Sequence, residues 1–401
     1  MVKGIEIGNA STNGALSAQT DTLEQRRFTY RQLSPGDAAP WFTQQSTSNP
    51  NYVLDTAAGR WIVLALAVTA SDEIGKACQA FAMANTSIFN DSFASLFLVS
   101  QDPQDKNEAR FHEHLPGVRV FWDFDGKIAQ LYGVMPKERG GGHGLPARRM
   151  WIILDPTLRV KHVQPFEDDG SDREKLSAYL QELPAPSRFA NQELQAPILY
   201  LPDVFEQDLC AQLIALYQAD GGAESGFMRE VQGKTVMLTD PAHKRRRDFL
   251  ITDPNLIGTI QNRILRRIVP EIKKVHQFQV TRMERYIVGC YRAEDAGHFR
   301  QHRDNTTSGT AHRRFAVSIN LNSDFDGGQI SFPEYGPRQF KPEPGSAVVF
   351  SCSLLHAVSP VTRGDRYAFL PFLYDDAAAA LRESNNARLG DGVNAYNQTI
   401  T

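Results

Sequence analysis

The stretch GHFRQHRDN (residues 297–305) decides how the C-terminal half of the chain folds. His298 and His302 are four residues apart, a spacing that would place both imidazoles on one face of a helix, as in zinc-binding helices. In a strand, His302 and Asp304 lie on one face, about 6.6 Å apart along the backbone, whereas the two histidines are about 13 Å apart. Gly297 and the strand-like neighbouring segments argue against a helix. We therefore select His302 and Asp304 as the pair that can share one metal ion.

Strand-like segments surround this stretch on both sides. Turns that contain Gly and Pro separate them, most clearly DGG at 326–328 and PEPG at 342–345. The segments are QVTRMERYIV (279–288), RFAVSINLN (314–322), QISFP (329–333), SAVVFSC (346–352) and RYAFLPFLY (366–374). Two helical patterns, at 199–218 and 255–272, come before them. We expect a double-stranded β-helix, or jelly roll, with supporting helices.

Two polar segments have two readings each. In 314–322 apolar residues alternate with a face that carries Ser318, Asn320 and Asn322, so the segment either lines a pocket or is an ordinary half-solvated strand. The basic run HKRRRD (243–248) is either a solvated stretch or a loop that meets an anionic substrate.

A third ligand candidate is His356, which follows the apolar strand SAVVF. Two imidazoles and one carboxylate leave metal positions open, and this is the ligand set of non-heme Fe(II) oxygenases. Arg366 lies ten residues after His356, and a guanidinium there can grip a dicarboxylate through two hydrogen bonds. Such an arginine is expected if 2-oxoglutarate binds the metal through its keto-acid end.

Four runs extend this pattern into a family resemblance. They are CYRAEDAGHFRQHRDN, SINLNSDFDGGQISFPE, FKPEPGSAVVF and LLHAVSPVTRGDRY. Over roughly residues 196–376 the chain resembles the 2-oxoglutarate/Fe(II) oxygenases of the prolyl 4-hydroxylase type. The resemblance implies that the catalytic iron ligands are His302, Asp304 and His356, and that the distal carboxylate of the co-substrate binds Arg366 and Tyr291. We add Ser318 to the candidate co-substrate contacts. Arg366 replaces the lysine of the prolyl hydroxylases, and the spacing from Tyr291 to His302 is slightly longer than usual.

The resemblance also implies a reaction. It implies Fe(II), 2-oxoglutarate and O2, with ascorbate as the candidate reductant, and hydroxylation of an unactivated C–H bond with release of succinate and CO2. The expected substrate is an amino-acid residue, free or peptidyl and proline-like, or a small metabolite.

The first half of the chain alternates apolar runs with helical patterns, which predicts an α/β sheet. LSPGDAAPWF (33–42), FLVSQD (97–102), WDFDGKIAQLYGV (122–134) and RRMWIILDP (148–156) make it similar to a peroxiredoxin-like thioredoxin fold over 33–183. That family attacks peroxides with a cysteine three residues after a threonine. Here Thr69 is present, but Asp72 stands at the position of the nucleophile, and a carboxylate cannot replace a thiolate.

The activating arginine of the family is matched by Arg149. We therefore expect a non-catalytic domain. The alternative function is a thiol-dependent peroxidase or redox protein that uses Cys78, six residues later.

The composition of the chain limits the number of domains, the partners and the cellular location that we expect. A chain of 401 residues with 41% apolar and 22% charged residues predicts two soluble domains. A net charge of −3 argues against nucleic-acid binding, and the absence of long apolar runs argues against a membrane. The start of the chain lacks the apolar core of a signal peptide, and the four scattered cysteines predict free thiols, so we expect a cytoplasmic protein.

The predicted organisation has five parts. They are an N-terminal extension (1–32), the peroxiredoxin-like domain (33–183), a linker (184–195), the oxygenase domain (196–376) and a C-terminal tail (377–401). In the tail, DDAAAALRESNN predicts a short helix, and a loose polar segment is expected to follow it. The N-terminal domain and the tail are the candidate surfaces for a homodimer.

Overall fold

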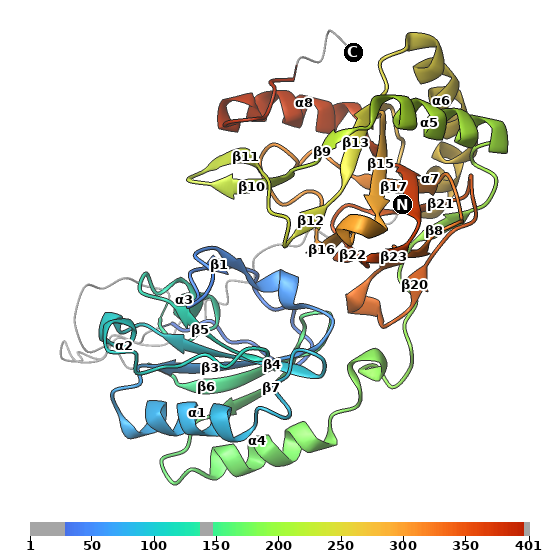
Figure 1. Ribbon diagram of the computed structural model, residues 1–401. Coiled ribbons are helices and arrows are strands. Elements are labelled where there is room, and N and C mark those ends of the chain that lie inside the picture. Colours follow the sequence, from blue (N-terminus) through green and yellow to red (C-terminus); the bar gives the residue numbers. More distant parts are fainter. Residues whose placement is uncertain (1–28, 137–146, 397–401) are drawn as a thin grey trace, which may run out of the picture.

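The computed structural model describes residues 29–136 and 147–396 and shows two domains (Figure 1). The N-terminal domain is coloured blue to green, and the C-terminal domain runs from green through yellow to red. Most of the predicted extension at 1–32 lies outside the described residues. Within the described part of the chain, no helix combines the length and the apolar character that a membrane span requires.

A five-stranded sheet with the order β5-β4-β3-β6-β7 forms the centre of the N-terminal domain. The elements of the domain are β1 (Thr43–Gln44), β2 (Tyr52–Val53), η1 (Leu54–Ala57), β3 (Trp61–Val68), α1 (Glu73–Ala84), β4 (Ala94–Ser100), α2 (Pro103–Asn107), β5 (Val118–Trp122), α3 (Lys127–Leu131), β6 (Met150–Leu154), β7 (Val160–Pro165) and α4 (Ser171–Glu182). Strands β3, β4 and β5 are parallel, whereas β6 and β7 are antiparallel to their neighbours.

Both faces of this sheet are covered, which explains the unbroken apolar run WIVLALAV in β3. Helices α1 and α4 pack on one face through side chains such as Cys78 and Leu176. The N-terminal segment and α3 cover the other face, with Phe42 and Ile128 in the core. The predicted thioredoxin-like α/β domain is confirmed.

Two large antiparallel sheets form the core of the C-terminal domain, and two further sheets have two strands each. Its elements are β8 (Leu199–Leu201), α5 (Gln207–Asp220), β9 (Ala223–Glu224), β10 (Phe227–Val231), β11 (Lys234–Leu238), β12 (Lys244–Arg245), β13 (Arg247–Leu250), α6 (Pro254–Arg267), α7 (Val269–His276), β14 (Arg282–Glu284), β15 (Ile287–Arg292), β16 (His298–His302), β17 (Phe315–Asn320), β18 (Asp326–Gly327), β19 (Ile330–Ser331), η4 (Pro333–Tyr335), β20 (Gln339–Phe340), β21 (Ala347–Ser351), β22 (His356–Val358), β23 (Val361–Arg363), β24 (Asp365–Phe369), β25 (Phe372–Tyr374) and α8 (Asp376–Ser384). The major sheet has nine strands and includes the path β14-β25-β17-β24-β15-β13-β9, and the minor sheet has the order β12-β16-β22-β19-β20.

The two sheets pack face to face. Side chains of β17 point alternately to the outer and to the inner face of the major sheet. Val317 and Ile319 join a core that helices α5, α6 and α7 cover from outside (Figure 1). Ala316 instead joins a core shared with residues of the minor sheet, such as Phe299 and Val358. Since successive side chains of a strand alternate, Ser318 lies on this inner face too. The predicted jelly roll with supporting helices is confirmed.

The segments outside the two domains are more ordered than their composition suggests. The predicted linker starts at Pro184, whose carbonyl accepts a hydrogen bond of 2.9 Å from the indole N–H of Trp61. The short helix expected at the start of the C-terminal tail is present as α8. Tyr396, in the part that was expected to be loose, packs on Tyr374 and Ala378 instead. Residues 397–401 lie outside the described part of the chain.

Candidate metal centre

Strand pairing brings the three predicted metal ligands together. His302 ends β16 and His356 begins β22, and these two residues are direct partners in the antiparallel register. Asp304 follows β16 and is held by a 2.9 Å backbone hydrogen bond from its N–H to the carbonyl of Cys352. Its carboxylate oxygens lie 3.5 Å from Nε2 of His302 and 3.4 Å from Nε2 of His356. One ligand atom from each residue fits within 4.8 Å of the others.

The second nitrogen of each imidazole fixes the orientation of the ring. Nδ1 of His302 lies 2.7 Å from the carbonyl oxygen of Arg300, and Nδ1 of His356 lies 3.0 Å from that of Leu354. Each Nδ1 therefore carries the proton and donates it, which leaves Nε2 with a free lone pair. Backbone acceptors of this kind are the usual outer partners of metal-bound histidines.

Electrostatics keep the ligands in their metal-binding protonation states. Burial, followed by the neighbouring His356, lowers the pKa of His302 to about 4, so its ring is neutral at pH 7. Burial alone would raise the pKa of Asp304, but His356 and His302 hold it below its usual value. A neutral imidazole and an ionised carboxylate are two members of the donor set that Fe(II) takes in a facial triad, and the imidazole of His356 supplies the third position. The residues present therefore fit the metal.

Arg366 occupies the position expected for a co-substrate anchor. It lies on β24 opposite Tyr291 of β15 and is only 1% exposed. Its Nη2 donates to Oγ of Ser318 at 2.9 Å and its Nε to Oδ1 of Asn320 at 3.1 Å. Within the described residues Nη1 has no hydrogen-bond partner, and no carboxylate forms an ion pair with the guanidinium. A buried cation with an unused donor fits the distal carboxylate of 2-oxoglutarate.

A small cavity of about 60 Å³ connects this arginine with the metal ligands, because its lining includes Arg366, Tyr291, His302, Asp304 and His356. Burial lowers the pKa of Arg366 to about 10, a cost that an anionic ligand would offset.

Two of the predicted co-substrate contacts have roles that differ from each other. The hydroxyl of Tyr291 accepts a 3.3 Å hydrogen bond from Nη1 of Arg246, and its ring lies 5.3 Å from the guanidinium carbon of Arg366. Ser318 instead acts on Arg366 as an acceptor and so orients it. Sequence reasoning missed Asn320 as a partner of Arg366, although it lies two residues after Ser318 and therefore on the same face of β17.

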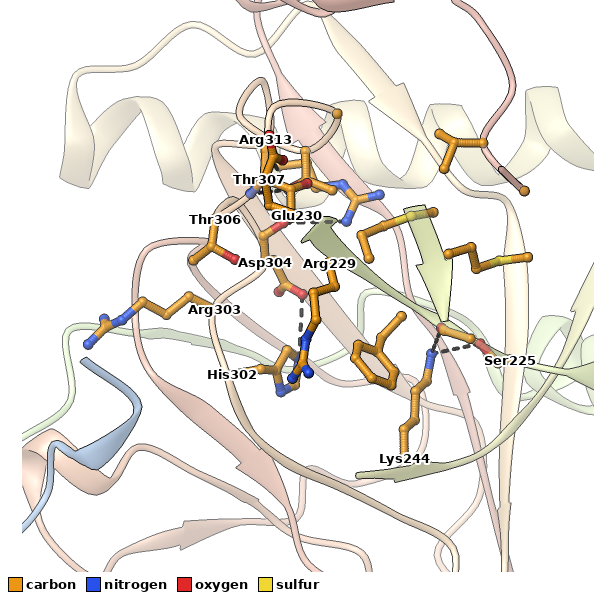
Figure 2. A pocket seen from close by; sticks show the side chains of 18 of the residues that line it. Ser225, Arg229, Glu230, Lys244, His302, Arg303, Asp304, Thr306, Thr307 and Arg313 are labelled. Atoms are coloured by element: carbon orange, nitrogen blue, oxygen red, sulfur yellow. Dashed lines mark hydrogen bonds and ion pairs between the residues drawn. The ribbon is translucent and has the colours of Figure 1, made fainter. Parts of the chain in front are cut away.

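A larger cavity of about 600 Å³ opens beside His302 and Asp304 and is lined by both domains. Lining residues of the N-terminal domain are Thr43, Asn51, Val53, Asp55 and Thr56. The β10–β11 hairpin supplies Arg229, which lines the same cavity as His302 (Figure 2). Arg229 forms no ion pair with a carboxylate of residues 29–136 or 147–396. Its charge is therefore free for a ligand in this cavity.

The basic run 243–248 is not a solvated stretch throughout, so the first reading of it was wrong at two positions. Lys244 is 4% and Arg246 is 8% exposed. The ammonium of Lys244 donates to Oγ of Ser225 and to the carbonyl of Gly226, both at 2.7 Å (Figure 2). The side chain of Lys244 turns inward because β12 pairs with β16 at the edge of the minor sheet. Composition alone cannot show this pairing.

Phe299 and His298 precede the metal ligand His302 on β16 but differ in role. The ring of Phe299 stacks on the imidazole of His302 at a centroid distance of 3.5 Å and limits its rotation. His298 bonds through Nδ1 to the carbonyl of Ala296 at 2.8 Å and does not join the ligand group. The expected strand is present over His298–His302, and Asp304 lies in the turn that follows it.

The N-terminal domain carries an ion pair at the position of the peroxidatic cysteine. Asp72 caps α1 by accepting a hydrogen bond from the N–H of Gly75, and its carboxylate lies 2.6 Å from Nη2 of Arg149. Cys78 is fully buried, and burial raises the pKa of its thiol. A buried neutral thiol is inert. This arrangement argues against the peroxidase alternative.

Comparison with known proteins supports both halves of this description. The model of the AhpC/TSA family matches residues 35–163, and that of the 2OG-Fe(II) oxygenase superfamily matches residues 283–374.

Individual relatives match the C-terminal half. A PKHD-type hydroxylase of Pseudomonas putida is 26% identical over 212 residues, which cover 47% of this chain and 86% of that protein. The PKHD-type hydroxylase PiuC of Pseudomonas aeruginosa is 35% identical over 91 residues, 20% of this chain and 39% of that protein. A crystal structure of a Pseudomonas putida prolyl-4-hydroxylase has 16% sequence identity and a TM-score of 0.34, over 45% of this chain and 93% of that one. The chain therefore joins an N-terminal domain of the AhpC/TSA family to a C-terminal domain of the 2OG-Fe(II) oxygenase superfamily, and it is a 2-oxoglutarate-dependent Fe(II) dioxygenase.

Proposed function

We propose that this enzyme hydroxylates an unactivated C–H bond of an amino-acid residue, free or peptidyl, or of a small polar metabolite, and releases succinate and CO2. The observation that carries the co-substrate assignment is the unused Nη1 of Arg366, buried in the same small cavity as the three ligands. Hydroxylase relatives support the reaction type. Bound iron would supply the activation of O2, which no side chain of the protein can perform.

The residues of the chain have separate tasks in this proposal. His302, Asp304 and His356 hold the metal. Arg366 binds the distal carboxylate of 2-oxoglutarate and thereby orients its other end toward the metal. Phe299 lines both the small and the larger cavity, and its ring stacks on that of His302 and keeps it in place.

The lining of the larger cavity supports a polar substrate. It combines threonines, asparagines and charged side chains, among which Arg229 has no ion-pair partner within the described residues. A substrate with a carboxylate would pair with this guanidinium. Amino acids and peptides carry such a group, and so do many acidic metabolites.

The decisive experiment is anaerobic titration of the full chain with Fe(II) and 2-oxoglutarate, followed by oxygen. We expect succinate to form, and a screen of amino acids, peptides and acidic metabolites to give one product that is heavier by one oxygen atom. Ascorbate is tested as an additive that sustains turnover.

A pair of histidine variants provides the control. His302→Ala should abolish succinate formation, whereas His298→Ala, on the same strand but outside the ligand group, should retain it. Unchanged turnover in His302→Ala would show that the metal centre is assigned wrongly.

A further inference from the structure

We propose that the N-terminal AhpC/TSA domain is a working part of the oxygenase site, because its residue Asp55 clamps the two chain segments that carry the metal ligands. Asp55 is a positioning residue and acts through Arg303, the residue between His302 and Asp304. The inference rests on the proposed metal centre, and it assigns a task to a domain whose peroxidase nucleophile is missing.

The clamp starts at Arg303. Because successive residues of an extended chain point to opposite sides, Arg303 points away from the metal ligands on either side of it. Figure 2 shows its side chain turned away from Asp304 and His302. There Nε donates to Oδ2 of Asp55 at 3.0 Å, across 248 positions of sequence. The ring of Trp41, also from the N-terminal domain, lies 4.6 Å from the guanidinium carbon.

The same guanidinium is tied to the segment that carries the third ligand. Nη2 donates to Oε1 of Glu334 at 2.8 Å and Nη1 to Oε2 at 3.2 Å. Nη1 also donates to the carbonyl of Ser353. Oε2 of Glu334 then accepts the backbone N–H of Leu355 at 3.1 Å, one residue before His356. One buried network therefore joins the segments 302–304 and 353–356.

Packing anchors this network in the N-terminal domain. The side chain of Leu355 is fully buried in the core of that domain, beside residues of η1 and the sheet. A Cβ at Gly59 would come within 2.6 Å of Cβ of Pro333, the residue before Glu334, so the two backbones approach closely there. The segment before His356 is thus fixed from both domains.

Burial makes the charges interdependent. The exposed fractions of the side chains are 3% for Arg303, 5% for Asp55 and 8% for Glu334. Little water reaches this ion triad, so a guanidinium that lost one carboxylate could not be fully compensated by solvent. We infer that loss of Asp55 shifts Arg303, and with it the backbone that sets the separation of His302 and Asp304. Outer contacts of this kind typically change metal affinity by about 10- to 100-fold.

The test is the affinity of the full-length protein for Mn(II), which needs no substrate and no turnover. Anaerobic calorimetry compares wild type with Asp55→Asn, which removes the charge and keeps the shape, and the electron paramagnetic resonance spectrum of bound Mn(II) reports the ligand geometry. Asp91→Asn is the matched control, because Asp91 makes a comparable pair with Arg119, at 2.6 Å, inside the N-terminal domain. We expect Asp55→Asn to weaken Mn(II) binding about tenfold and to alter the spectrum. Asp91→Asn should do neither.

Equal Mn(II) affinity of wild type and folded Asp55→Asn would overturn the clamp and leave the proposed function intact. Failure of wild type to bind Mn(II) would overturn the metal centre itself. If Asp55→Asn does not fold, Trp41→Leu replaces it, since Trp41 is 51% exposed and its loss removes only the ring beside Arg303. A weakening of about two- to fivefold is then expected, and no change would overturn the proposal.

Discussion

Replacing Arg366 by glutamine should weaken 2-oxoglutarate binding without weakening metal binding. The guanidinium is buried, has two neutral acceptors in Ser318 and Asn320, and leaves Nη1 without a partner among the described residues. Glutamine is a neutral donor of smaller reach, so the charge-assisted bond to the distal carboxylate is lost.

The size of the effect follows from that bond. Hydrogen bonds to charged groups contribute about 1.5–3 kcal/mol. This range corresponds to a Kd for 2-oxoglutarate that rises about 10- to 150-fold. Arg366→Lys keeps the charge but loses the planar fork, so we expect an intermediate Kd. The metal affinity should stay close to that of wild type, because Arg366 is not among the three ligands.

The assay is anaerobic calorimetry of 2-oxoglutarate binding to the Mn(II)-loaded protein. Arg363→Gln serves as control, since Arg363 is 64% exposed and pairs with Asp326 at 2.6 Å on the surface. A Kd for Arg366→Gln within twofold of wild type would refute the reasoning, because it would mean that the carboxylate binds elsewhere.

Three further predictions concern stability and reactivity. Burial alone would raise the pKa of Glu284, but Arg313 and Arg382 hold that pKa below 4.5. The ionised carboxylate therefore stabilises the fold above pH 4.5, and this stabilisation is lost as the pH falls. Glu284→Gln should lower the free energy of unfolding by about 3–5 kcal/mol at pH 7 and flatten the acid side of a plot of Tm against pH. A Glu284→Gln profile as steep as that of wild type would contradict this. Iodoacetamide should not modify Cys78 in the folded protein at pH 8, and fast modification there would revive the peroxidase alternative. Leu355→Ala should lower the free energy of unfolding by about 2–5 kcal/mol in denaturant titrations, and a smaller loss would show that its contact with the N-terminal core is loose.

Much of the site could be predicted from sequence because side chains alternate along an extended chain, although a register shift between Phe299 and His302 interrupts the pairing of β16 with β22. The period of two separates His302 and Asp304 from Arg303, and the same period places Ser318 on the inner face of β17. Strand β3 was recognisable because a strand buried on both faces is apolar at every position.

The contacts that could not be predicted join segments that are far apart in the chain. Nothing in the sequence indicates that Asp55 meets Arg303, since this pairing depends on how the two domains pack. Lys244 likewise lies in a basic run typical of solvated surfaces, and only its place on β12, at the edge of the minor sheet beside β16, turns it inward. Composition describes the local environment of a residue, whereas these roles depend on tertiary packing.

Asp72 and Arg149 form an ion pair at the two positions that the family resemblance matches to the nucleophile and the activating arginine of peroxiredoxins. The carboxylate sits at the first turn of α1, where backbone N–H groups and a guanidinium converge. A sulfur atom at the same spot would meet the two influences that favour a thiolate. Asp72→Cys is therefore a route by which an engineer could give this oxygenase a second, thiol-based activity on the same polypeptide.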